Sequence, residues 1–575
     1  MRGTLAARAA PRLDLPPLRA ALVFGALALL FVGLAGRSVH LQLVEDEFLK
    51  GQGAARHSRE IEVPAHRGRI TDRHGEALAI STPVKSLWAF PAKFSATPAQ
   101  LAALAKILET TPASLTRQVG AAGDFVYLAK RIPPETAERA LGLRIQGLNH
   151  ENEYRRYYPG GDVLGHVVGF TGDRDAGQEG LELAQQAWLG GSAGARRVII
   201  DRRGDVVEDV AAVRAPREGR DLALSIDSRL QFMAFRELKA AVEQHKAKAG
   251  GLVVLDVQTG EVLALVNLPA YNPNRRDKVE REKMRNRAFT DTFEPGSTLK
   301  PFAIATALDA GLVKPTSVVQ TGASMTIGNA TIRDAHAHGP LTVEEVLQKS
   351  SNIGTARIAL QIPAETMHAR LAAAGFGTPT RAGFPGEVSG RLRPAKSWKP
   401  IEQATISYGH GISTNLVQLA RAYTIFATDG QLKPATLLKA AGPAAGAPVL
   451  RPESARAVRR MLEMATQPGG TAPKAQVVGY RVAGKTGTAH KLEGGTYANK
   501  YVSSFVGFAP ASNPRIVVAV MIDEPSGGQY YGGLVAAPVF SSVTGAALRL
   551  LGVPADAPAN NVILPADDGE VREET

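Results

Sequence analysis

Residues 294–301 read Glu-Pro-Gly-Ser-Thr-Leu-Lys-Pro, and they place the hydroxyl of Ser297 three residues before the amine of Lys300. Positions i and i+3 share a face of a helix, and an amine held against a hydroxyl can accept its proton and make it a nucleophile. The apolar run at 302–308 predicts a buried helix, and Pro301 is tolerated only in its first turn. We therefore expect Ser297 at a helix N-terminus, where backbone N–H groups stabilise a developing anion.

The composition describes a globular protein of more than one domain. The chain has 575 residues, of which 44% are hydrophobic and 21% charged, and a single core rarely serves so long a chain. The net charge of +13 suits an anionic membrane surface or an anionic polymer. With 6% aromatics and no nucleic-acid motif, we expect no nucleic-acid partner. The absence of cysteine excludes cysteine nucleophiles, disulfides and thiolate metal sites.

The N-terminus carries a candidate membrane anchor. A charge-free run extends over 20–36, and it is preceded by Arg2, Arg8, Arg12 and Arg19. The run is at the lower length limit for a membrane-spanning helix, and the arginines favour a cytoplasmic N-terminus. We predict a cytoplasmic tail at 1–18 and a transmembrane helix at 19–43. The alternative is a signal peptide that is cleaved near 33–35.

The first half of the chain, 44–215, reads as an α+β module with a binding or positioning role. Arg-His-Gly is a turn between two short runs and predicts a hairpin over 70–79. Patterns rich in alanine and leucine predict helices over 97–118 and 134–143. The Arg-Arg-Tyr-Tyr stretch at 155–158 could bind a sugar or a base, but a packing corner is the commoner role. We find no acid pair, metal cluster or phosphate loop in this half.

The second half, 216–553, alternates helices and strands in a way typical of an α+β domain. Hydrophobic periodicity predicts helices over 231–245 and 535–551, and strands over 251–256, 261–266, 482–489, 501–508 and 516–522. The last three strands would form an antiparallel meander. The Pro- and Asn-rich segment 269–286 reads as a surface loop, and the acidic, Pro-rich tail 554–575 reads as disordered.

Two further motifs could complete a site for acyl transfer, which a lone Ser-x-x-Lys cannot establish. Ser350 and Asn352 lie in a helical pattern over 346–360 and would add a hydroxyl relay and an amide. A second Ser-x-Asn at 413–415 shows how weak this triplet is by itself.

The third motif, Lys485-Thr486-Gly487-Thr488, lies in the predicted strand 482–489. Its ammonium and hydroxyls would bind a substrate carboxylate, its glycine would allow a close approach, and a backbone N–H could join an oxyanion hole.

His336 and His338 form a His-x-His pair that could bind zinc. Gly339-Pro340 follows at once, however, and the sequence offers no further ligand nearby. We therefore expect a loop that packs near the active site, and no metal.

The three motifs, in this order on a helix, a helix and a strand, resemble those of the penicilloyl serine transferases. Stretches of the first half resemble motifs of the non-catalytic domain of class B penicillin-binding proteins: Arg67 to Gly75, Arg156 to Pro159 and Glu179 to Glu182. The resemblance implies an α+β multidomain chain with one transmembrane helix, an elongated α+β pedestal (dimerisation) domain and a transpeptidase domain. The transpeptidase domain would be an antiparallel five-stranded sheet flanked by helices, as in β-lactamases.

Within class B, the amino-acid sequence of the motifs is similar to that of the division-type (septal) enzymes. The segment 286–297, the Asn352 that ends the second motif and the Thr486 in the third carry this similarity. Ser351 and His490 depart from the usual pattern, which leaves acceptor selectivity and drug affinity open.

The family implies a D,D-transpeptidase that cross-links peptidoglycan stem peptides ending in D-Ala-D-Ala and that is acylated by β-lactams. Ser297 would be the nucleophile. Lys300 would be its general base, with an amine kept neutral by desolvation and by the charge of Lys485. Ser350 and Lys485 would pass a proton to the departing D-Ala, and Asn352 would hold the donor peptide and orient Lys300. No cofactor or metal is implied.

Two groups of residues would recognise the reacting peptide. The backbone N–H groups of Ser297 and Thr488 would form the oxyanion hole. Thr486, Gly487 and Thr488 would bind the terminal carboxylate of the donor peptide.

The family also implies a single-pass protein of the bacterial inner membrane, with its N-terminus in the cytoplasm and its catalytic domain in the periplasm at the septum. Its partners would be a SEDS-family lipid II polymerase and other division proteins. The alternatives are an elongation-type relative, a β-lactamase and a non-enzymatic division scaffold.

Overall fold

The structure, a computed structural model, describes residues 16–44, 58–121, 123, 125–172, 175–200, 206–276 and 279–564. By its internal contacts, the chain divides into two compact units, residues 1–65 with 192–217 and residues 66–191 with 218–575.

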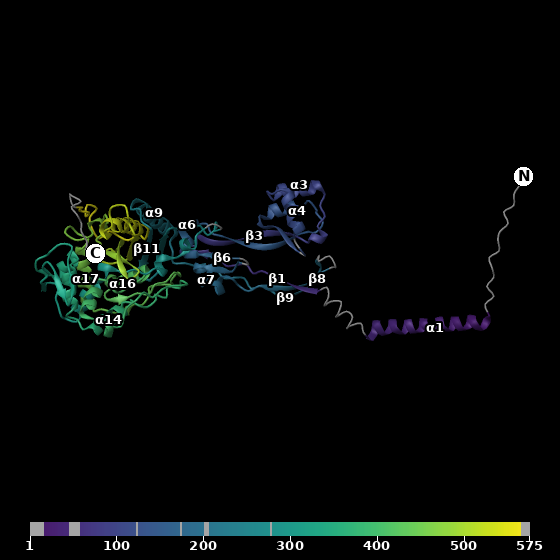
Figure 1. Cartoon of the computed structure of the whole chain (residues 1–575), viewed down its shortest axis with the longest axis horizontal. Helices are drawn as coiled ribbons and strands as arrows, with labels where there is room; N and C mark the ends of the chain where they lie inside the picture. The colour runs from purple at the N-terminus through teal and green to yellow at the C-terminus, as the bar shows by residue number, and fades with distance from the viewer. Residues whose placement is uncertain are drawn as a thin grey trace. The chain divides into compact units, whose positions relative to one another are not determined.

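The first unit contains the N-terminal helix. Helix α1 (Pro17–Val39) continues as a π-helical turn, η1 (His40–Val44) (Figure 1). Pro17–Gln42 is the one helix in the described part of the chain that is long and apolar enough to cross a membrane, with a mean hydropathy of 2.2. Its apolar side chains are exposed, as a lipid-facing helix requires. The helix covers nearly all of the predicted span 19–43, and most of the predicted tail 1–18 lies outside the described residues.

The first unit also contains a three-stranded antiparallel sheet with β8 in its middle. Its strands are β1 (Ser58–Val63), β8 (Gly194–Ile200) and β9 (Val206–Arg214). The turn expected at 202–204 lies outside the described residues.

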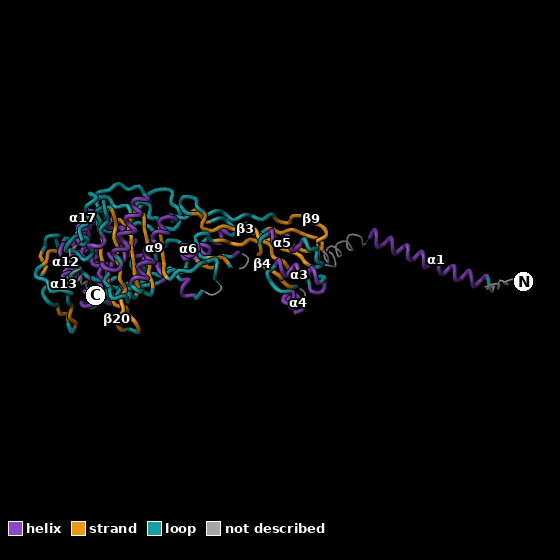
Figure 2. Tube along the Cα trace, turned by 90° about the horizontal axis from the view of Figure 1, so that it is seen from above, coloured by secondary structure: helices purple, strands orange, loops and turns teal. Residues whose placement is uncertain are grey.

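The second unit begins with a mixed sheet that has β3 at its centre. Figure 2 labels two of its strands, β3 and β4. Its strands are β2 (Ile70–Thr71), β3 (Ala77–Ala89), β4 (Val126–Ile132), β5 (Leu148–Tyr157) and β10 (Leu222–Ala223). The predicted hairpin at 70–79 is confirmed, and Gly75 supplies the positive φ of +93° that its turn needs.

Three helices pack with this sheet around a small core that includes Leu87, Leu104 and Leu115. They are α3 (Pro98–Ile107), α4 (Pro112–Ala121) and α5 (Pro134–Leu141). The single helix predicted over 97–118 is therefore wrong, because the chain leaves the helical region at Glu109 and restarts at Pro112.

The stretch beside the two tyrosines is a packing corner, as expected. The buried Glu182 accepts hydrogen bonds from the guanidinium groups of Arg67 and Arg156, each at 2.7 Å. The Tyr158 hydroxyl is buried and accepts the backbone N–H of Thr171 at 2.8 Å. The corner pairs most of these buried polar groups with one another, although one terminal nitrogen of Arg156 has no hydrogen-bond partner.

A five-stranded antiparallel sheet organises the rest of the second unit, with the order β12-β11-β21-β20-β19. Its strands are β11 (Ala249–Asp256), β12 (Val262–Leu268), β19 (Ala483–Glu493), β20 (Thr496–Ala509) and β21 (Ile516–Asp523). The five strands and the meander predicted from the sequence are confirmed.

Alternation along the strands builds two cores, one on each face of this sheet. On β21, Val518 and Val520 pack in the core shared with α9 (Ser228–Gln244) and α19 (Ala537–Leu550). Val517 and Ala519 pack in the core shared with α11 (Lys300–Asp309) and α16 (Leu416–Ala427). In Figure 1, β11 lies between α9 and α16. Helix α11 on the second face carries Lys300.

The hydrophobic core of this unit crosses the domain boundary predicted between residues 215 and 216. Ile70 and Leu164 belong to the same buried cluster as Leu224 and Leu255. A boundary at residue 215 stays a prediction about the sequence, but it does not separate two cores.

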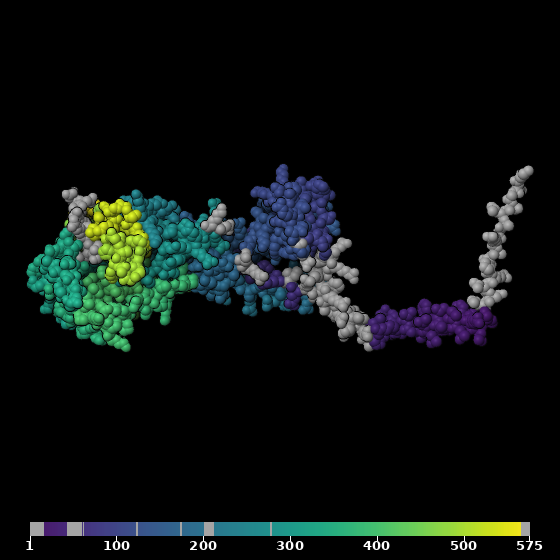
Figure 3. Space-filling model, in the orientation of Figure 1, coloured from purple at the N-terminus to yellow at the C-terminus, as the bar shows by residue number. Residues whose placement is uncertain are grey.

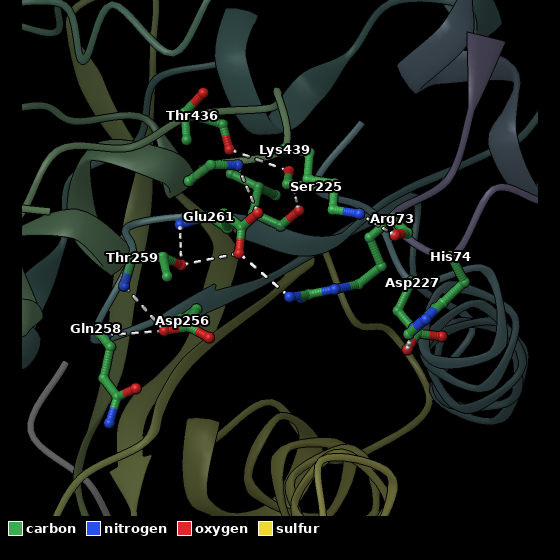
Figure 4. Close-up of polar contacts among 12 residues, drawn as sticks. Arg73, His74, Ser225, Asp227, Asp256, Gln258, Thr259, Glu261, Thr436 and Lys439 are labelled. Atoms are coloured by element: carbon green, nitrogen blue, oxygen red, sulfur yellow. Dashed lines mark hydrogen bonds and ion pairs between the residues drawn. The ribbon is translucent and has the colours of Figure 1, made fainter. Parts of the chain in front are cut away.

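Polar contacts tie the same two segments together (Figure 4). Arg73 forms an ion pair with Glu261 at 3.3 Å, and its carbonyl oxygen accepts the Lys439 ammonium at 2.9 Å. His74 contacts the Asp227 carboxylate at 3.0 Å. The hairpin at 70–79 therefore rests directly on the segments beside β12 and α9.

The segment 269–286 is more than the surface loop that we predicted. Tyr271 is buried and donates its hydroxyl to the carbonyl oxygen of Gly165 at 2.9 Å. Asn286 is also buried and donates to the carbonyl oxygen of His166 at 3.0 Å. Polar groups of the segment thus pair with helix α6 (Gly161–Val168), which keeps the segment on the body of the unit.

The disorder predicted from residue 554 onwards is contradicted as far as residue 564. The Asn561 amide donates to the carbonyl oxygens of Val477 and Tyr480, both at 3.0 Å, and Asp556 accepts the Arg481 N–H at 2.7 Å. Side-chain pairing with a neighbouring loop orders a segment that is too polar to form a core. In Figure 3, the C-terminal part of the described chain, which includes this segment, is coloured yellow. Residues 565–575 lie outside the described residues.

The described residues also form the following elements. The remaining helices are α7 (Gly180–Ala184), α8 (Gln186–Leu189), α10 (Arg287–Thr290), α12 (Val343–Lys349), α13 (Asn352–Ala359), α14 (Ala364–Ala373), α15 (Pro400–Ser407), α17 (Pro452–Met464) and α18 (Gly532–Val535). The remaining strands form the pairs β6 (Phe170–Thr171) with β7 (Gly177–Glu179), β13 (Val318–Val319) with β16 (Leu341–Thr342), β14 (Met325–Ile327) with β15 (Ala330–Ile332), and β17 (Gln431–Leu432) with β18 (Ala447–Pro448). Single 3₁₀ turns are η2 (Pro91–Lys93), η4 (Arg281–Met284), η5 (Gly296–Leu299), η6 (Ala395–Ser397) and η7 (Pro473–Ala475).

Candidate active site

Ser297 lies in the 3₁₀ turn η5, which leads directly into α11. The expectation of a helix N-terminus holds with one difference, because the α-helix itself begins at Lys300 and Pro301 occupies its first turn. Ser297 is 5% exposed and Lys300 is fully buried. Gly296 has a φ of +56°, which lets the chain enter the turn without strain.

Tyr423, for which the sequence predicts no role in the site, holds the turn η5 in place. The buried Tyr423 on α16 donates its hydroxyl to the carbonyl oxygen of Thr298 at 2.7 Å. The Thr298 hydroxyl donates to the carbonyl oxygen of Pro295, also at 2.7 Å. The sequence carries no signal for this role of Tyr423, because an aromatic residue in an apolar helix reads as ordinary core.

Ser350 is brought to Lys300 by a break in the helix predicted over 346–360. Helix α12 ends at Lys349, Ser350 adopts a left-handed conformation with a φ of +64°, and α13 begins at Asn352. The Lys300 Nζ donates to the Ser350 Oγ at 3.1 Å and also to the Ser350 carbonyl oxygen. The continuous helix is thus a wrong prediction.

The residues around Ser351 explain the break. The Ser351 hydroxyl accepts the Gly354 N–H at 2.8 Å and so caps α13. Asp334 accepts the Ser351 hydroxyl at 2.5 Å and the Ile353 N–H at 2.9 Å. The loop with His336 and His338 therefore packs beside the second motif, as we expected, through the aspartate that precedes the histidines.

The third motif lies on β19, and its side chains are buried. The Lys485 Nζ donates to the Thr486 Oγ1 at 3.2 Å, and the Thr486 hydroxyl donates to the Thr471 Oγ1 at 3.0 Å. The Thr488 Oγ1 accepts the Gly532 N–H at 3.0 Å. Thr471 lies outside the three sequence motifs, and no local pattern indicates its role.

Strand β19 lies directly against the Ser297 turn. A Cβ on Gly487 would lie 2.8 Å from the Pro295 carbonyl oxygen and 2.9 Å from the Thr298 Cγ2, so only glycine fits. Asn352 begins α13, next to Ser350, and is 7% exposed. The structure therefore gathers the three motifs around one turn, and the N–H groups of Ser297 and Thr488 belong to the two segments that meet there.

The second Ser-x-Asn has a structural role. The Asn415 side chain accepts the Gln418 N–H at 2.7 Å and caps α16. The contact with Lys300 thus distinguishes the triplet at 350–352 from its duplicate at 413–415.

A pocket of about 280 Å³ opens beside the site and is lined by His410, His490, Tyr497, Ala498 and Asn499. The pKa of His410 is lowered to about 4, mainly because its ring is buried. The segment that carries His410 touches the nucleophile turn, because a Cβ on Gly409 would lie 2.1 Å from the Gly296 carbonyl oxygen.

Comparisons with known proteins agree with this arrangement. Residues 250–545 match the family model "Penicillin binding protein transpeptidase domain", and residues 62–224 match "Penicillin-binding Protein dimerisation domain". The chain is 44% identical over 541 residues to the "Probable peptidoglycan D,D-transpeptidase PenA" of Neisseria meningitidis, and 93% of each chain is covered.

The chain belongs to the class B penicillin-binding proteins.

Two further similar proteins are also peptidoglycan-synthesis enzymes or domains of penicillin-binding proteins. This class B transpeptidase is 40% identical over 547 residues to the "Peptidoglycan D,D-transpeptidase FtsI" of Escherichia coli, with 94% of this chain and 93% of the relative covered. The solved "TP domain from Burkholderia pseudomallei penicillin-binding protein 3" shares 50% identity and a TM-score of 0.54, and covers 58% of this chain and 98% of its own. The protein is therefore a serine-type peptidoglycan D,D-transpeptidase, and its N-terminal helix is consistent with a membrane-anchored member of the class.

Proposed function

We propose that this transpeptidase cross-links stem peptides at the division septum, with Ser297 as its nucleophile. The observation that carries the residue assignment is the contact between Lys300 and Ser350 beside the Ser297 turn. An amine within one turn of a serine, joined to a second hydroxyl, is the arrangement that acyl transfer through a serine ester needs.

In the acylation step, the Ser297 oxygen attacks the carbonyl carbon between the two D-alanines, and its proton passes to the neutral amine of Lys300. The oxyanion that forms would accept the N–H groups of Ser297 and Thr488, and one such donor typically contributes about 3 kcal/mol to the transition state. The peptide bond breaks, and the leaving D-Ala nitrogen takes a proton from Lys300 through the Ser350 hydroxyl, assisted by Lys485.

In the second step, the amine of another stem peptide attacks the ester carbon. An amide bond forms, the ester bond to Ser297 breaks, and the Ser297 oxygen regains the proton that the attacking nitrogen loses through Lys300. Thr486, Gly487 and Thr488 would hold the carboxylate of the donor before the first step, and Asn352 would hold its peptide backbone. β-Lactams would acylate Ser297 by the first step alone.

Covalent labelling with a fluorescent penicillin tests the nucleophile. The Ser297→Ala variant should lose labelling while it keeps the melting temperature of the parent. Stoichiometric labelling of this variant would refute the assignment. Rapid turnover of penicillin by the parent protein would favour the β-lactamase alternative over the transpeptidase.

The septal role is supported by the FtsI relative and by the similarity of the sequence at 286–297 to division-type enzymes. A fluorescent fusion expressed from the native locus should gather at midcell. A fusion spread along the side wall would favour an elongation-type enzyme.

We propose the same chain organisation as above, with a pedestal at 44–215, a transpeptidase domain at 216–553, a cytoplasmic N-terminus and a periplasmic catalytic domain. The chain has no cysteine, so a single introduced cysteine reports its own compartment. A membrane-impermeant maleimide should label Ser397→Cys in intact spheroplasts and should leave Arg8→Cys unlabelled. We further propose a SEDS-family lipid II polymerase and other division proteins as partners, which co-purification through the membrane helix would test.

A further inference from the structure

Glu294 is a carboxylate beside the nucleophile that the proposed mechanism does not use. It lies three residues before Ser297, and its Oε1 accepts the Gly411 N–H at 2.8 Å. Its Oε2 accepts the Tyr497 hydroxyl at 3.1 Å. Within the described ranges, its polar partners are this backbone N–H and this hydroxyl, and neither is a lysine or an arginine. Burial raises the pKa of Glu294 above its ordinary value, and the hydrogen bonds from Gly411 and Tyr497 oppose this rise only in part.

Glu294 lies where two walls of the pocket meet the nucleophile turn. One wall is the segment with His410, which is anchored because the Gly296 N–H donates to the Gly409 carbonyl oxygen at 3.3 Å. The other wall is the β19–β20 hairpin, which carries His490 and Tyr497. The pocket therefore opens near the turn that holds Ser297. The Glu294 carboxylate contacts the pocket wall by accepting the Tyr497 hydroxyl.

The charges at the two ends of the site differ. The hydroxyls of Thr486 and Thr488 and the Lys485 ammonium suit the carboxylate of the donor peptide. A carboxylate at Glu294 would repel that group and attract a cation. The pocket lining contains no lysine or arginine, and its imidazole at His410 is neutral at neutral pH because burial lowers its pKa to about 4.

Cross-linking needs a second substrate that carries an amine. An aliphatic amine has a pKa near 10, so it reaches the enzyme mainly as an ammonium ion. An ionised carboxylate has about four acceptor positions, and the Glu294 carboxylate can accept an ammonium N–H in addition to its two present donors.

We propose that Glu294 and the pocket lined by His410 and Tyr497 bind the ammonium group of the acceptor stem peptide. This inference rests on the proposed function and names the site for its second substrate. The ammonium releases its proton to solvent before it attacks, and the bond changes are those of the second step above. Glu294 stays ionised throughout and acts as a binding residue that sets the acceptor's position.

The test compares the two half-reactions in the full-length protein in detergent. Glu294→Gln keeps the shape of the side chain and can still accept the Gly411 N–H, but it removes the charge. A fluorescent penicillin measures acylation of Ser297. A D-Ala-D-Ala pentapeptide donor with a synthetic stem tetrapeptide as amine acceptor measures cross-linking and hydrolysis by their products.

We expect the KM for the amine acceptor to rise at least tenfold in Glu294→Gln, with hydrolysed product replacing cross-linked product, while acylation changes less than threefold. Glu493→Gln is the matched control, because Glu493 lies on the same hairpin and pairs with the exposed Lys500. Its acceptor KM should equal that of the parent. An unchanged acceptor KM in Glu294→Gln, or an equal rise in both variants, would overturn the proposal.

A measurement on the parent protein keeps the test decisive if Glu294→Gln folds poorly. Salt screens an ammonium–carboxylate contact, so the KM for the amine acceptor should rise between 50 mM and 500 mM NaCl, whereas the KM for uncharged hydroxylamine should not. Equal salt responses would count against the proposal. Failure of the proposed function is seen separately, because acylation of Ser297 would then be absent from the parent itself.

Discussion

The Lys300 Nζ lies 3.1 Å from the Ser350 Oγ and donates a hydrogen bond to it, although the two residues are 50 positions apart in the chain. The contact exists because Ser350 takes up a left-handed backbone conformation between α12 and α13. A non-glycine residue in this conformation costs on the order of 1 kcal/mol or more, and such strain is common at functional sites. The strained serine and the buried lysine therefore form one unit of the site.

This contact predicts a strong effect of Ser350→Ala on acylation. The variant keeps the Ser350 carbonyl oxygen that Lys300 also contacts, but it removes the hydroxyl that would carry the proton. The second-order rate constant for labelling by a fluorescent penicillin should fall roughly 10²- to 10⁴-fold, the usual contribution of a general acid–base group. Ser397→Ala, at an exposed serine of η6, should label at the parent rate. A Ser350→Ala rate within twofold of the parent would exclude a relay through this hydroxyl.

The close approach of β19 to the nucleophile turn predicts the result of Gly487→Ala. The new methyl group would collide with the Pro295 carbonyl oxygen and with Thr298, so the strand or the turn must move. A displacement of about 1 Å at a reacting centre can cost on the order of 100-fold in rate, and penicillin labelling should fall by about this factor. Gly442→Ala is the matched control, because its Cβ would meet no atom within 4 Å. Equal rates for the two variants would contradict the role of the close approach.

The sequence predicts the parts of this molecule in which local pattern and tertiary structure agree. The strands of the five-stranded sheet alternate or run fully apolar, and the motifs at 297, 350 and 485 have reactive groups at fixed spacing. The break at Ser350 could not be predicted in this way, because the apolar spacing of a helix continues through it from Val346 to Ile358. A local cap, formed by Ser351 with Asp334, overrides that spacing.

Long-range hydrogen bonds explain the other features that the sequence did not predict. Tyr423 reads as a core aromatic, and only its contact with Thr298 shows that it holds the nucleophile turn. The order of residues 554–564 depends on side chains such as Asn561 that pair with a loop about 80 residues earlier. No local periodicity reports a partner at that distance, so composition alone predicts disorder.

The buried corner of the second unit predicts a large loss of stability in Glu182→Gln. This carboxylate is fully buried and is the shared partner of Arg67 and Arg156. The substitution removes the only carboxylate that forms direct ion pairs with these two guanidinium groups within the described residues. Removal of one partner of a buried ion pair costs about 3–5 kcal/mol. Glu138→Gln breaks an exposed pair with Lys85 and should cost less than about 1 kcal/mol. Thermal unfolding of both variants measures the difference, and similar melting temperatures would contradict it.

His166 predicts a dependence of stability on pH. Its ring is buried, and its Nε2 contacts the carbonyl oxygen of Lys283 at 2.8 Å, so the Nε2 carries the proton of a neutral imidazole. Burial lowers the pKa of His166 to about 4, against 6.5 in the unfolded chain. Between these two values the unfolded chain binds a proton that the folded chain does not, so the free energy of unfolding falls as the pH falls.

The expected loss from this residue is about 3 kcal/mol between pH 7.5 and pH 4, because each unit of pKa difference corresponds to about 1.4 kcal/mol. His166→Gln can still donate to the Lys283 carbonyl oxygen but does not titrate, so its unfolding free energy should fall less steeply with acid than that of the parent. Denaturant titrations at pH 7.5, 6, 5 and 4 compare the two slopes. If the free energy of unfolding fell equally with pH in the parent and in His166→Gln, the folded protein would bind a proton on His166 without losing stability, which would contradict the prediction.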